Sequence, residues 1–491
     1  MHYLPQGWII CKLNEIIELF GGFAFKSKDY TDSGVPVLRM GNITKDFKLN
    51  WNKPKQPYIP IHRLSEFEKY KLEGGEIVIC LTDLSETGAY LGTVAIVEGQ
   101  TPALLNQRVS KIIFNETLIN KKYLYFALCN PSFRHYMVSD DTGSLQKNTN
   151  HNYILEYKFQ LAPLNEQKRI VAKLEKLLGK VNDCQERLEK IPTLLKRFRQ
   201  SVLAAACSGR LTADWREKNP NVEPAEELLN QLETPYPKPH FNVFEQSCNY
   251  DIPNSWKFIP LGKLGTLTGG GTPAKSKAEY WEGHIPWISA KDMKFDRIRD
   301  SINHISEDAI KNSSTKKIPK GSILFVVRGM ILAHTFPVAI TDDVVTVNQD
   351  IKALIPEKIE LNEYLFISIK LIAQNILFAT KEATHGTRRV ETGVLQNWAI
   401  PLPPLEEQKE IVKRVKALFK KCDLIEQRYQ QAKAYTDKLT QSILAKAFRG
   451  ELVPQDPNDE PASVLLEKIK AEKAEQEKKP KRKTTKKRSQ K

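Results

Sequence analysis

The sequence predicts an α+β protein in which two globular domains of mixed strands and helices alternate with two long helices. The helices are expected to pack on each other as an antiparallel coiled coil, with the two halves of the chain related by a pseudo-twofold axis. Three observations support this fold class: one helical segment occurs twice, its apolar residues have coiled-coil spacing, and short apolar runs broken by Gly, Asn and Asp precede each copy. Such interrupted runs are typical of strands and turns.

The repeated helical segment is the most secure of these features. One copy begins at Pro163 and ends at Leu211, and the other begins at Pro404 and ends at Leu452, with no insertion in either. A repeat of this length indicates two copies of one structural unit. Proline near the start and glycine near the end (Gly209, Gly450) are typical helix boundaries.

Apolar residues in each copy step alternately by four and three positions. They are Ile170, Leu174, Leu177, Val181, Cys184, Leu188, Ile191, Leu195, Phe198 and Val202 in the first copy, and Ile411, Val415, Leu418, Cys422, Ile425, Tyr429, Ala432, Thr436, Leu439 and Ile443 in the second. This is the spacing of a coiled-coil seam, which needs a partner, and the other copy is the simplest one. Pro192, present only in the first copy, is expected to kink its helix. Two ordinary core helices are the alternative, which the length and the seam disfavour.

The rest of the chain divides around these helices. In the first globular segment, strands are expected at Val35–Met40, Glu76–Leu81 and Thr93–Val97, and a helix at Leu118–Leu128. The second globular segment repeats its landmarks faintly, with Trp256 in the place of Trp8. The predicted segments are a first domain at 1–162, a long helix at 163–211, a Pro-rich linker at 212–254 with a short helix near Ala225–Leu232, a second domain at 255–403, a long helix at 404–452, a trailing helical segment at 453–477 and a disordered basic tail at 478–491.

Composition narrows the possible functions. The chain has 491 residues and a net charge of +16, which favours a polyanionic partner. The seven cysteines are scattered without a CxxC pair, so neither a zinc site nor a disulfide framework is expected. There is no signal-like start and no apolar run of membrane-spanning length, so we expect a soluble, cytoplasmic protein without a membrane partner.

Two unlike domains held apart by a helical rod suggest a calliper for duplex DNA. About 45 residues of helix give a rod of roughly 68 Å, and B-DNA repeats every ~34 Å. Two readers on such a rod could reach successive exposures of the major groove. Divergent readers would recognise an asymmetric, bipartite site, and the length of the rod would fix the unread gap between its halves.

Candidate base readers lie in the polar connections between predicted strands. In the first domain they are Arg39, Asn42, Arg108, Gln146, Lys147 and Asn148, and in the second Lys291, Asp292, Arg328, His385, Arg388 and Arg389. Arg, Lys, Asn and Gln are the side chains that contact base edges and phosphates. Any one of them could instead be an ordinary solvated surface group. The clusters at 142–148 and 385–389, which occupy matched places, are the stronger candidates.

These segments resemble a known family. GGGTPAKSKAEYWEGHIPWISAKDM (Gly269–Met293) is similar to the opening of a target-recognition domain in type I restriction–modification specificity subunits, and PLPPLEEQKEIVKRV (Pro401–Val415) and its partner at Pro163 resemble that family's conserved helical regions. SGRLTADWRE (Ser208–Glu217) is similar to its central region. The first domain departs from this pattern, with GGFAFKSKDY in place of the GGTP form.

The resemblance implies a non-catalytic subunit whose two domains each read half of a split site in double-stranded DNA. It also implies two methyltransferase subunits docked on the helices, for which Gln167, Lys168, Gln408 and Lys409 are candidate contacts. Those partners would use S-adenosylmethionine to methylate adenine. Separate restriction and motor subunits would use ATP and Mg to translocate and cut. No cofactor is expected in this chain itself.

Two weak catalytic motifs bear on the alternative, a self-contained DNA methyltransferase or nuclease. Asn130-Pro131-Ser132-Phe133 lacks the second proline of an adenine methyltransferase loop, and GGGTPAKS (Gly269–Ser276) has alanine where a phosphate loop needs glycine. Neither favours catalysis. A coiled-coil spacer that binds no DNA is the third hypothesis.

Overall fold

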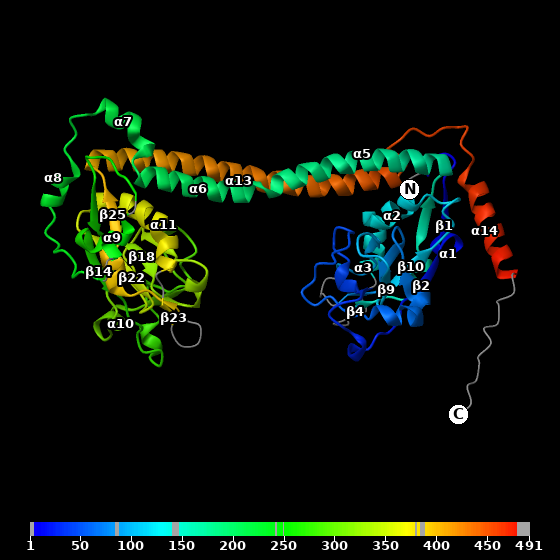
Figure 1. Ribbon diagram of the computed structural model, residues 1–491, viewed down its shortest axis with the longest axis horizontal. Helices are drawn as coiled ribbons and strands as arrows, with labels where there is room; N and C mark the ends of the chain where they lie inside the picture. The colour runs from blue at the N-terminus through cyan, green and yellow to red at the C-terminus, as the bar shows by residue number, and fades with distance from the viewer. Residues whose placement is uncertain are drawn as a thin grey trace. The chain divides into compact units, whose positions relative to one another are not determined.

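The computed structural model describes residues 4–83, 88–139, 147–240, 243–248, 250–378, 381–382 and 388–478 (Figure 1). It consists of two compact units. Unit 1 contains Met1–Glu189 and Gln430–Lys491, and unit 2 contains Lys190–Tyr429. Each unit has one domain of mixed strands and helices and a pair of long helical segments, so the predicted α+β class is confirmed. None of the helices in the described ranges is long and apolar enough to cross a membrane.

The first domain, which runs from β1 to β12, is built on an antiparallel sheet in the order β2-β10-β6-β8. These strands are β2 (Glu18–Gly21), β10 (Val109–Ile113), β6 (Ile77–Cys80) and β8 (Val94–Ile96). A second sheet has the order β4-β3-β9-β5, and its strands are β4 (Tyr58–Ile59), β3 (Val35–Leu38), β9 (Ala103–Leu105) and β5 (Lys71–Leu72). A ribbon of β1 (Ile9–Lys12) and β12 (Lys158–Leu161) leads into the long helix. The three predicted strands are confirmed as β3, β6 and β8.

The second domain, from β13 to β25, repeats this topology. Its main sheet has the order β14-β22-β18-β20-β16, formed by β14 (Gly265–Gly269), β22 (Ile351–Pro356), β18 (Ile323–Val326), β20 (Val338–Thr341) and an additional edge strand β16 (Arg297–Ile298). Its smaller sheet has the order β17-β15-β21, formed by β17 (Asn303–Ile305), β15 (Ile285–Ile288) and β21 (Thr346–Val347). The β13–β25 ribbon (Lys257–Pro260 with Ala399–Leu402) corresponds to β1–β12. The faint sequence repeat therefore reflects a shared fold.

Each domain has one helix that covers its main sheet, α2 (Lys121–Cys129) in the first and α11 (Asn362–Phe378) in the second. The predicted helix at Leu118–Leu128 is confirmed, with a start shifted to Lys121 because the Asn120 side chain caps it by accepting a hydrogen bond from the Tyr123 N–H. Tyr123 and Tyr364 are fully buried, and their hydroxyls donate to the carbonyl oxygens of Gln160 and Pro401.

The long helices are α5 (Leu164–Glu189), α6 (Ile191–Cys207) and α13 (Leu405–Phe448). The first long helix is interrupted at Lys190, two residues before Pro192, at the place where the kink was predicted. Within each unit the paired segments run antiparallel. In unit 1, Gln185 bonds Asp437 while Glu166 bonds Gln455, and in unit 2, Arg199 bonds Asp423 while Arg414 bonds the Leu211 carbonyl.

The predicted seam is buried for most of its length, but not everywhere. Ile170, Leu174 and Val181 in unit 1 and Val202, Ile411 and Val415 in unit 2 belong to hydrophobic cores shared with the domains, and Leu195 is also buried. Cys184, Phe198 and Ile425 are exposed, so their assignment to the buried seam was wrong.

A buried tryptophan–glutamate pair joins each domain to its helix. Trp8 donates its indole N–H to Glu166 at 2.9 Å, and Trp256 donates to Glu407 at 2.8 Å. Both carboxylates lie in the first turn of a helix, where the helix dipole favours negative charge. Two matched pairs, 241 residues apart on the helix side, show that the repeat includes the junction as well as the helix.

The Glu166 pair predicts a pH-dependent contribution to stability. Burial raises the pKa of the Glu166 carboxyl, although bonds from Trp8 and Gln455 oppose the shift. An acid whose folded-state pKa is raised is most favourable when protonated, so its contribution is present below the unfolded pKa of ~4.3 and is lost as pH rises through the folded pKa. We expect Glu166→Gln to remove this pH-dependent contribution. As pH rises from 4 to 7, the unfolding free energy of the variant should therefore increase relative to that of the parent chain. Urea denaturation across that range measures it, and a pH-independent difference between the chains would contradict the assignment.

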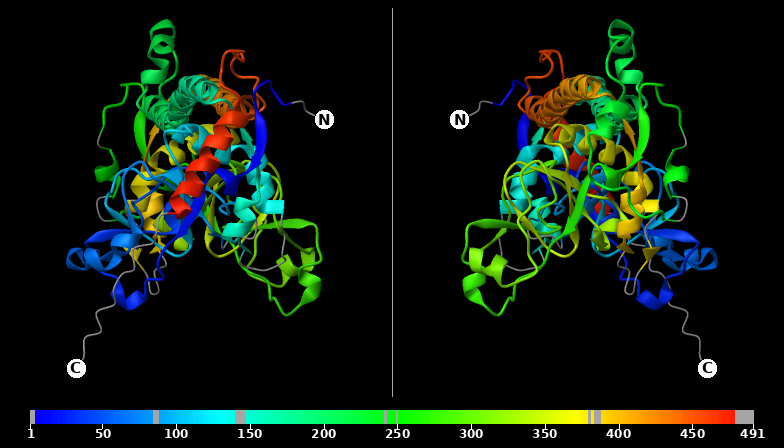
Figure 2. Two further views of the ribbon diagram at one scale, coloured as in Figure 1. Left: turned by 90° about the vertical axis from the view of Figure 1, so that its right-hand side faces the viewer. Right: turned by 90° about the vertical axis from the view of Figure 1, so that its left-hand side faces the viewer.

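The segments flanking the long helices pack against the domains. In unit 2, a short helix α8 (Ala225–Asn230) lies within the Pro-rich stretch, as predicted, and buries Ala225 and Leu228 in the core of the second domain. In unit 1, α14 (Ala462–Lys478) lies beside the start of the first domain, where Lys473 donates to the carbonyls of Asn14 and Ile17; α14 is the red helix in the left view of Figure 2.

Candidate nucleic-acid interface

Three chain segments meet at one edge of the first domain, just beyond the ends of its strands. The Leu81 N–H donates to the Arg108 carbonyl, and the Thr149 N–H donates to the Leu81 carbonyl, both at 2.9 Å. A short ladder continues this contact, since β7 (Thr82–Asp83) pairs with β11 (Lys147–Asn148). We call this edge the strand-end surface of the first domain. It brings Arg108 and the 147–148 segment, two of the predicted sites, onto either side of one strand.

The second domain has an equivalent strand-end surface. The Val327 N–H donates to the Asp350 carbonyl at 2.8 Å, and the Val390 N–H donates to the Val327 carbonyl at 2.9 Å. Here β19 (Arg328–Gly329) pairs with β24 (Arg388–Arg389), and β24 also pairs with β23 (Lys381–Glu382). Arg328 lies directly opposite Arg389 in the ladder. Lys291, on the loop after β15, is exposed.

A basic cavity opens beside the strand-end surface of the first domain. Its volume is about 470 Å³, and its walls include Arg39, Lys53, Lys55 and Arg108 without any acidic side chain. The Arg108 guanidinium lies 3.9 Å from the Met40 sulfur. A concentration of four cations without a carboxylate among them is a strong attraction for phosphate or for acceptor atoms on base edges.

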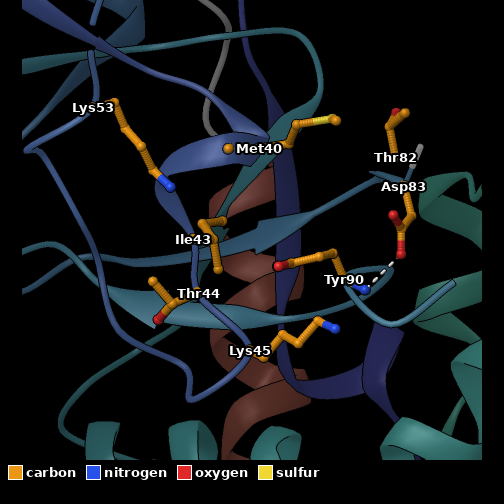
Figure 3. A pocket seen from close by; sticks show the side chains of 9 residues that line it. Met40, Ile43, Thr44, Lys45, Lys53, Thr82, Asp83 and Tyr90 are labelled. Atoms are coloured by element: carbon orange, nitrogen blue, oxygen red, sulfur yellow. Dashed lines mark hydrogen bonds between the residues drawn. The ribbon is translucent and has the colours of Figure 1, made fainter. Parts of the chain in front are cut away.

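A second cavity of about 540 Å³ adjoins the first and shares Met40, Gly41 and Lys53 with it (Figure 3). Lys53, Ile43 and Thr44 line one side of it, and Thr82 and Asp83 line the other. Tyr90 lies between them, with its N–H bonded to the Asp83 carboxylate at 2.6 Å and the Lys45 ammonium 5.3 Å from its ring centre. Aromatic and cationic groups around a concave surface suit a nucleic-acid ligand.

An interior arginine supports the loop that carries Tyr90. Arg134, on α3 (Pro131–Ser139), donates to the carbonyl oxygens of Ala89 and Leu91, and burial lowers its pKa. Burial also raises the pKa of the neighbouring Cys80 thiol to about 11, so this thiol is neutral at physiological pH. The loop that carries Tyr90 is therefore held to α3 by Arg134.

The pairing of the arginines distinguishes this surface from the rest of both domains. Arg63, Arg297 and Arg299 form salt bridges with carboxylates, and Arg134 bonds backbone carbonyls. The other five arginines of the two domains have no carboxylate partner among the described residues. They are Arg39, Arg108, Arg328, Arg388 and Arg389. All five had been predicted from the sequence as DNA contacts, and each retains guanidinium donors for an external acceptor.

Two of the predicted base readers have structural roles instead. Asn42 is buried, and its side chain accepts from the Arg39 N–H while donating to the Asn50 carbonyl and to Gln56. Asp292 accepts from the Ser289 N–H in the equivalent loop, and also from the Ile302 N–H. Because these side chains hold the turn after β3 and after β15, they are not available to bases. Short polar side chains favour such turns as strongly as they favour DNA contacts.

Gln146 and His385 lie outside the described residues, and of Lys147 only the backbone is described. Asn148 is exposed at the end of β11.

The basic cavity contains residues that the sequence reasoning missed. Lys53 and Lys55 lie in the segment Lys-Pro-Lys-Gln-Pro (53–57), between the predicted strands. Two lysines beside prolines in a loop next to Arg39 were a usable signal, because proline excludes regular structure and leaves such side chains at the surface.

The two weak catalytic motifs have structural explanations. Asn130-Pro131-Ser132-Phe133 forms the corner between α2 and α3, where Phe133 is fully buried in the core. In the glycine-rich segment, a Cβ on Gly270 would lie only 1.8 Å from the Val347 carbonyl oxygen, and Gly22 has the same close approach to Asn106. These glycines permit backbone packing rather than phosphate binding. The described residues contain no group of three His, Cys, Asp or Glu side chains that could hold a metal ion.

The predicted partner contacts divide into two kinds. Gln167 and Gln408 are buried, and their amides donate to the carbonyls of Ala162 and Pro403, so their assignment to a binding surface was wrong. Lys168 and Lys409 are exposed. The helical pattern explains the difference, since only the lysine of each Gln-Lys pair faces away from the domain.

Two copies of one fold, each with unpaired arginines at its strand ends, define a duplicated nucleic-acid-recognition protein without a recognisable catalytic centre in its described residues. Comparison with known proteins gives the class a name. The chain belongs to the type I restriction modification DNA specificity domain family, which matches it at residues 5–193 and 253–434, and its role is DNA recognition rather than catalysis.

Relatives match nearly the whole chain. The type I restriction enzyme EcoBI specificity subunit of Escherichia coli is 30% identical over 96% of this chain and 93% of its own length. The EcoKI specificity subunit of Escherichia coli strain K12 is 29% identical over 96% of both. Among solved structures, one from a study of assembly and conformational transition in the type I R-M system covers 92% of this chain and 100% of its own, with a TM-score of 0.65 and 19% identity. The HsdS subunit from Thermoanaerobacter tengcongensis covers 91% and 98%, with a TM-score of 0.51 and 18% identity. These structures support the fold.

Proposed function

We propose that this chain reads an asymmetric, bipartite sequence in double-stranded DNA, with one domain for each half. The observation that carries the proposal is the set of five arginines that have no carboxylate partner among the described residues and that lie on or beside the two strand-end surfaces. The surfaces share a backbone framework but carry different charged side chains, with Arg108 in the first domain and Arg328, Arg388 and Arg389 in the second. Equivalent frameworks favour the same mode of docking, and different side chains favour different half-sequences.

In the first domain, Arg39 and Arg108 are the proposed base readers, with Lys53 and Lys55 on phosphates. In the second domain, Lys291, Arg328, Arg388 and Arg389 have these roles. Arginine recognises guanine through two parallel hydrogen bonds to O6 and N7, whereas lysine on phosphate sets register without reading sequence. Gln146, Lys147, Asn148 and His385 are proposed as further contacts to DNA.

The helices are the proposed docking site for two methyltransferase subunits. In unit 2, the exposed apolar side chains Leu194 and Phe198 on α6 and Leu424 and Ile425 on α13 are available to a partner. Lys168 and Lys409 add a matched charged contact at the start of each copy. Partners would bring S-adenosylmethionine for adenine methylation, and restriction subunits would bring ATP- and Mg-dependent translocation and cleavage. The complex is proposed to act in the cytoplasm.

Genome-wide mapping of methylated adenine tests the function. A host that carries this chain with its methyltransferase subunit is expected to acquire methylation at one split motif, with two unlike halves and a fixed gap. The matched control carries the methyltransferase subunit alone. A continuous or palindromic motif would contradict two unlike readers, and methyl transfer or DNA cleavage by the purified chain alone would contradict the non-catalytic role.

A further inference from the structure

We infer that the two domains read their half-sites with opposite sides of equivalent surfaces, so that the guanine contacted by Arg108 and the guanine contacted by Arg328 lie at different positions within their halves. This inference rests on the proposed function and specifies which residue in each domain determines specificity. It depends on a comparison of the two domains, each considered in its own frame.

The backbone establishes which positions are equivalent. In the first domain, the residue after β6, Leu81, donates to the Arg108 carbonyl and accepts from Thr149. In the second, the residue after β18, Val327, donates to the Asp350 carbonyl and accepts from Val390. The two hydrogen bonds match in direction and order. Arg108 therefore corresponds to Asp350, and Thr82, which follows Leu81, corresponds to Arg328.

The two domains carry an arginine at different ones of these two positions. The first domain has arginine at the outer position (Arg108) and an uncharged, buried Thr82 at the central one. The second domain has aspartate at the outer position and Arg328 at the central one. Asp350 is held in its turn by its own N–H, which donates to Asn348 at 3.1 Å.

Arginines next to these two positions are distributed between the domains in the same way. Arg39 shares the basic cavity with Arg108, and its equivalent after β15 is Ser289, which has no charge. On the other side, the second domain places Arg389 opposite Arg328 in the ladder. The arginines of the first domain therefore lie on the β3–β9 side of the surface, and those of the second domain lie on the β19–β24 side, whereas the lysines Lys147 in β11 and Lys291 after β15 do not follow this division.

A displacement across one strand has a definite size on DNA. Adjacent strands are about 4.8 Å apart, and base pairs in a duplex are spaced by about 3.4 Å. If equivalent surfaces dock in the same way, the guanine read by Arg328 is displaced by one to two base pairs from the place where Arg108 reads in the other half. Asp350 at the outer position has no side-chain donor for guanine, and its carboxylate already accepts from the Asn348 amide at 3.3 Å.

The test uses the complex of this chain with its methyltransferase subunit and a library of duplexes randomised in both halves. Selected sequences are aligned on the methylated adenine of each half, which gives the two domains a common reference. We expect Arg108→Ala to relax one G·C position in one half and Arg328→Ala to relax one in the other. Each loss of discrimination should be about 5- to 150-fold. The distances from the methylated adenine to these positions should differ by one or two base pairs.

Arg63→Ala and Arg299→Ala are the matched controls, because each removes an arginine that pairs with a carboxylate away from the strand-end surface. Both are expected to leave the selected sequences unchanged. Equal distances in the two halves would overturn the inference and leave the proposed function intact. If neither Arg108→Ala nor Arg328→Ala altered any position while the variants remained folded by circular dichroism, both the inference and the proposed reading surface would fall.

Discussion

A chain in which Arg39, Lys53, Lys55 and Arg108 are all replaced by alanine is expected to lose affinity for duplex DNA on the order of 100-fold at low salt. These side chains surround one cavity of about 470 Å³ that contains no carboxylate. Each phosphate contact that is lost should also reduce the slope of log affinity against log salt by about 0.9, because fewer counterions are released on binding. A salt series in a fluorescence binding assay measures both effects.

The matched control removes the same charge from another part of unit 1. Lys12, Lys158, Lys468 and Lys470 lie on the β1–β12 ribbon and on α14, and three of them already pair with carboxylates. Their replacement by alanine should change the affinity and the slope much less. Equal losses from the two quadruple variants would mean that net charge, rather than the cavity, attracts DNA.

Replacement of Trp256 by alanine is expected to destabilise unit 2 by about 3–5 kcal/mol, the usual cost of truncating a buried tryptophan. The side chain is 2% exposed and packs in a core with Tyr364 and Ile411. Its loss also removes a donor from Glu407, which retains Arg216 and Thr212 as partners. Native-state hydrogen exchange of the full chain measures the effect, because amides of unit 2 should lose protection while those of unit 1 change little.

Three further variants sharpen this result. Trp256→Phe retains an aromatic ring but removes the indole N–H and its bond to Glu407, so it should cost about 1.5–3 kcal/mol. Trp8→Ala should move the loss of protection to unit 1. Tyr435→Ala, at an exposed aromatic on α13, should stay within about 0.5 kcal/mol of the parent. Equal loss of protection in both units after Trp256→Ala would show that the junction does not belong to one unit.

Residue type alone predicted the arginines of the candidate site more successfully than its short polar side chains. Among the residues that the structure describes, none of the five arginines selected from the sequence has a carboxylate partner, because arginine in a strand connection has few local acceptors unless an acid is nearby. Asn42 and Asp292 were selected by the same reasoning and were wrong. A short polar side chain next to a turn can reach its own backbone, and only the coordinates show that it does.

Gln167 and Gln408 failed for a related reason. Their repetition in both copies was interpreted as a common binding surface, but it reflects a common junction, in which each amide bonds a carbonyl five residues earlier. The same junctions contain the bonds from Trp8 to Glu166 and from Trp256 to Glu407, in which donor and acceptor are more than 150 residues apart in the chain. No local pattern could have revealed those bonds.

The sequence by itself determined the α+β class, the duplication, the positions of the long helices and the interruption near Pro192, because periodicity, repetition and proline act locally. Tertiary structure decided which polar side chains of each strand-end surface remain available and which are consumed by turns and junctions. It also decided that Arg108 corresponds to Asp350 and Thr82 to Arg328. Equivalence of that kind depends on hydrogen bonds between segments far apart in the chain, which only the folded backbone brings together.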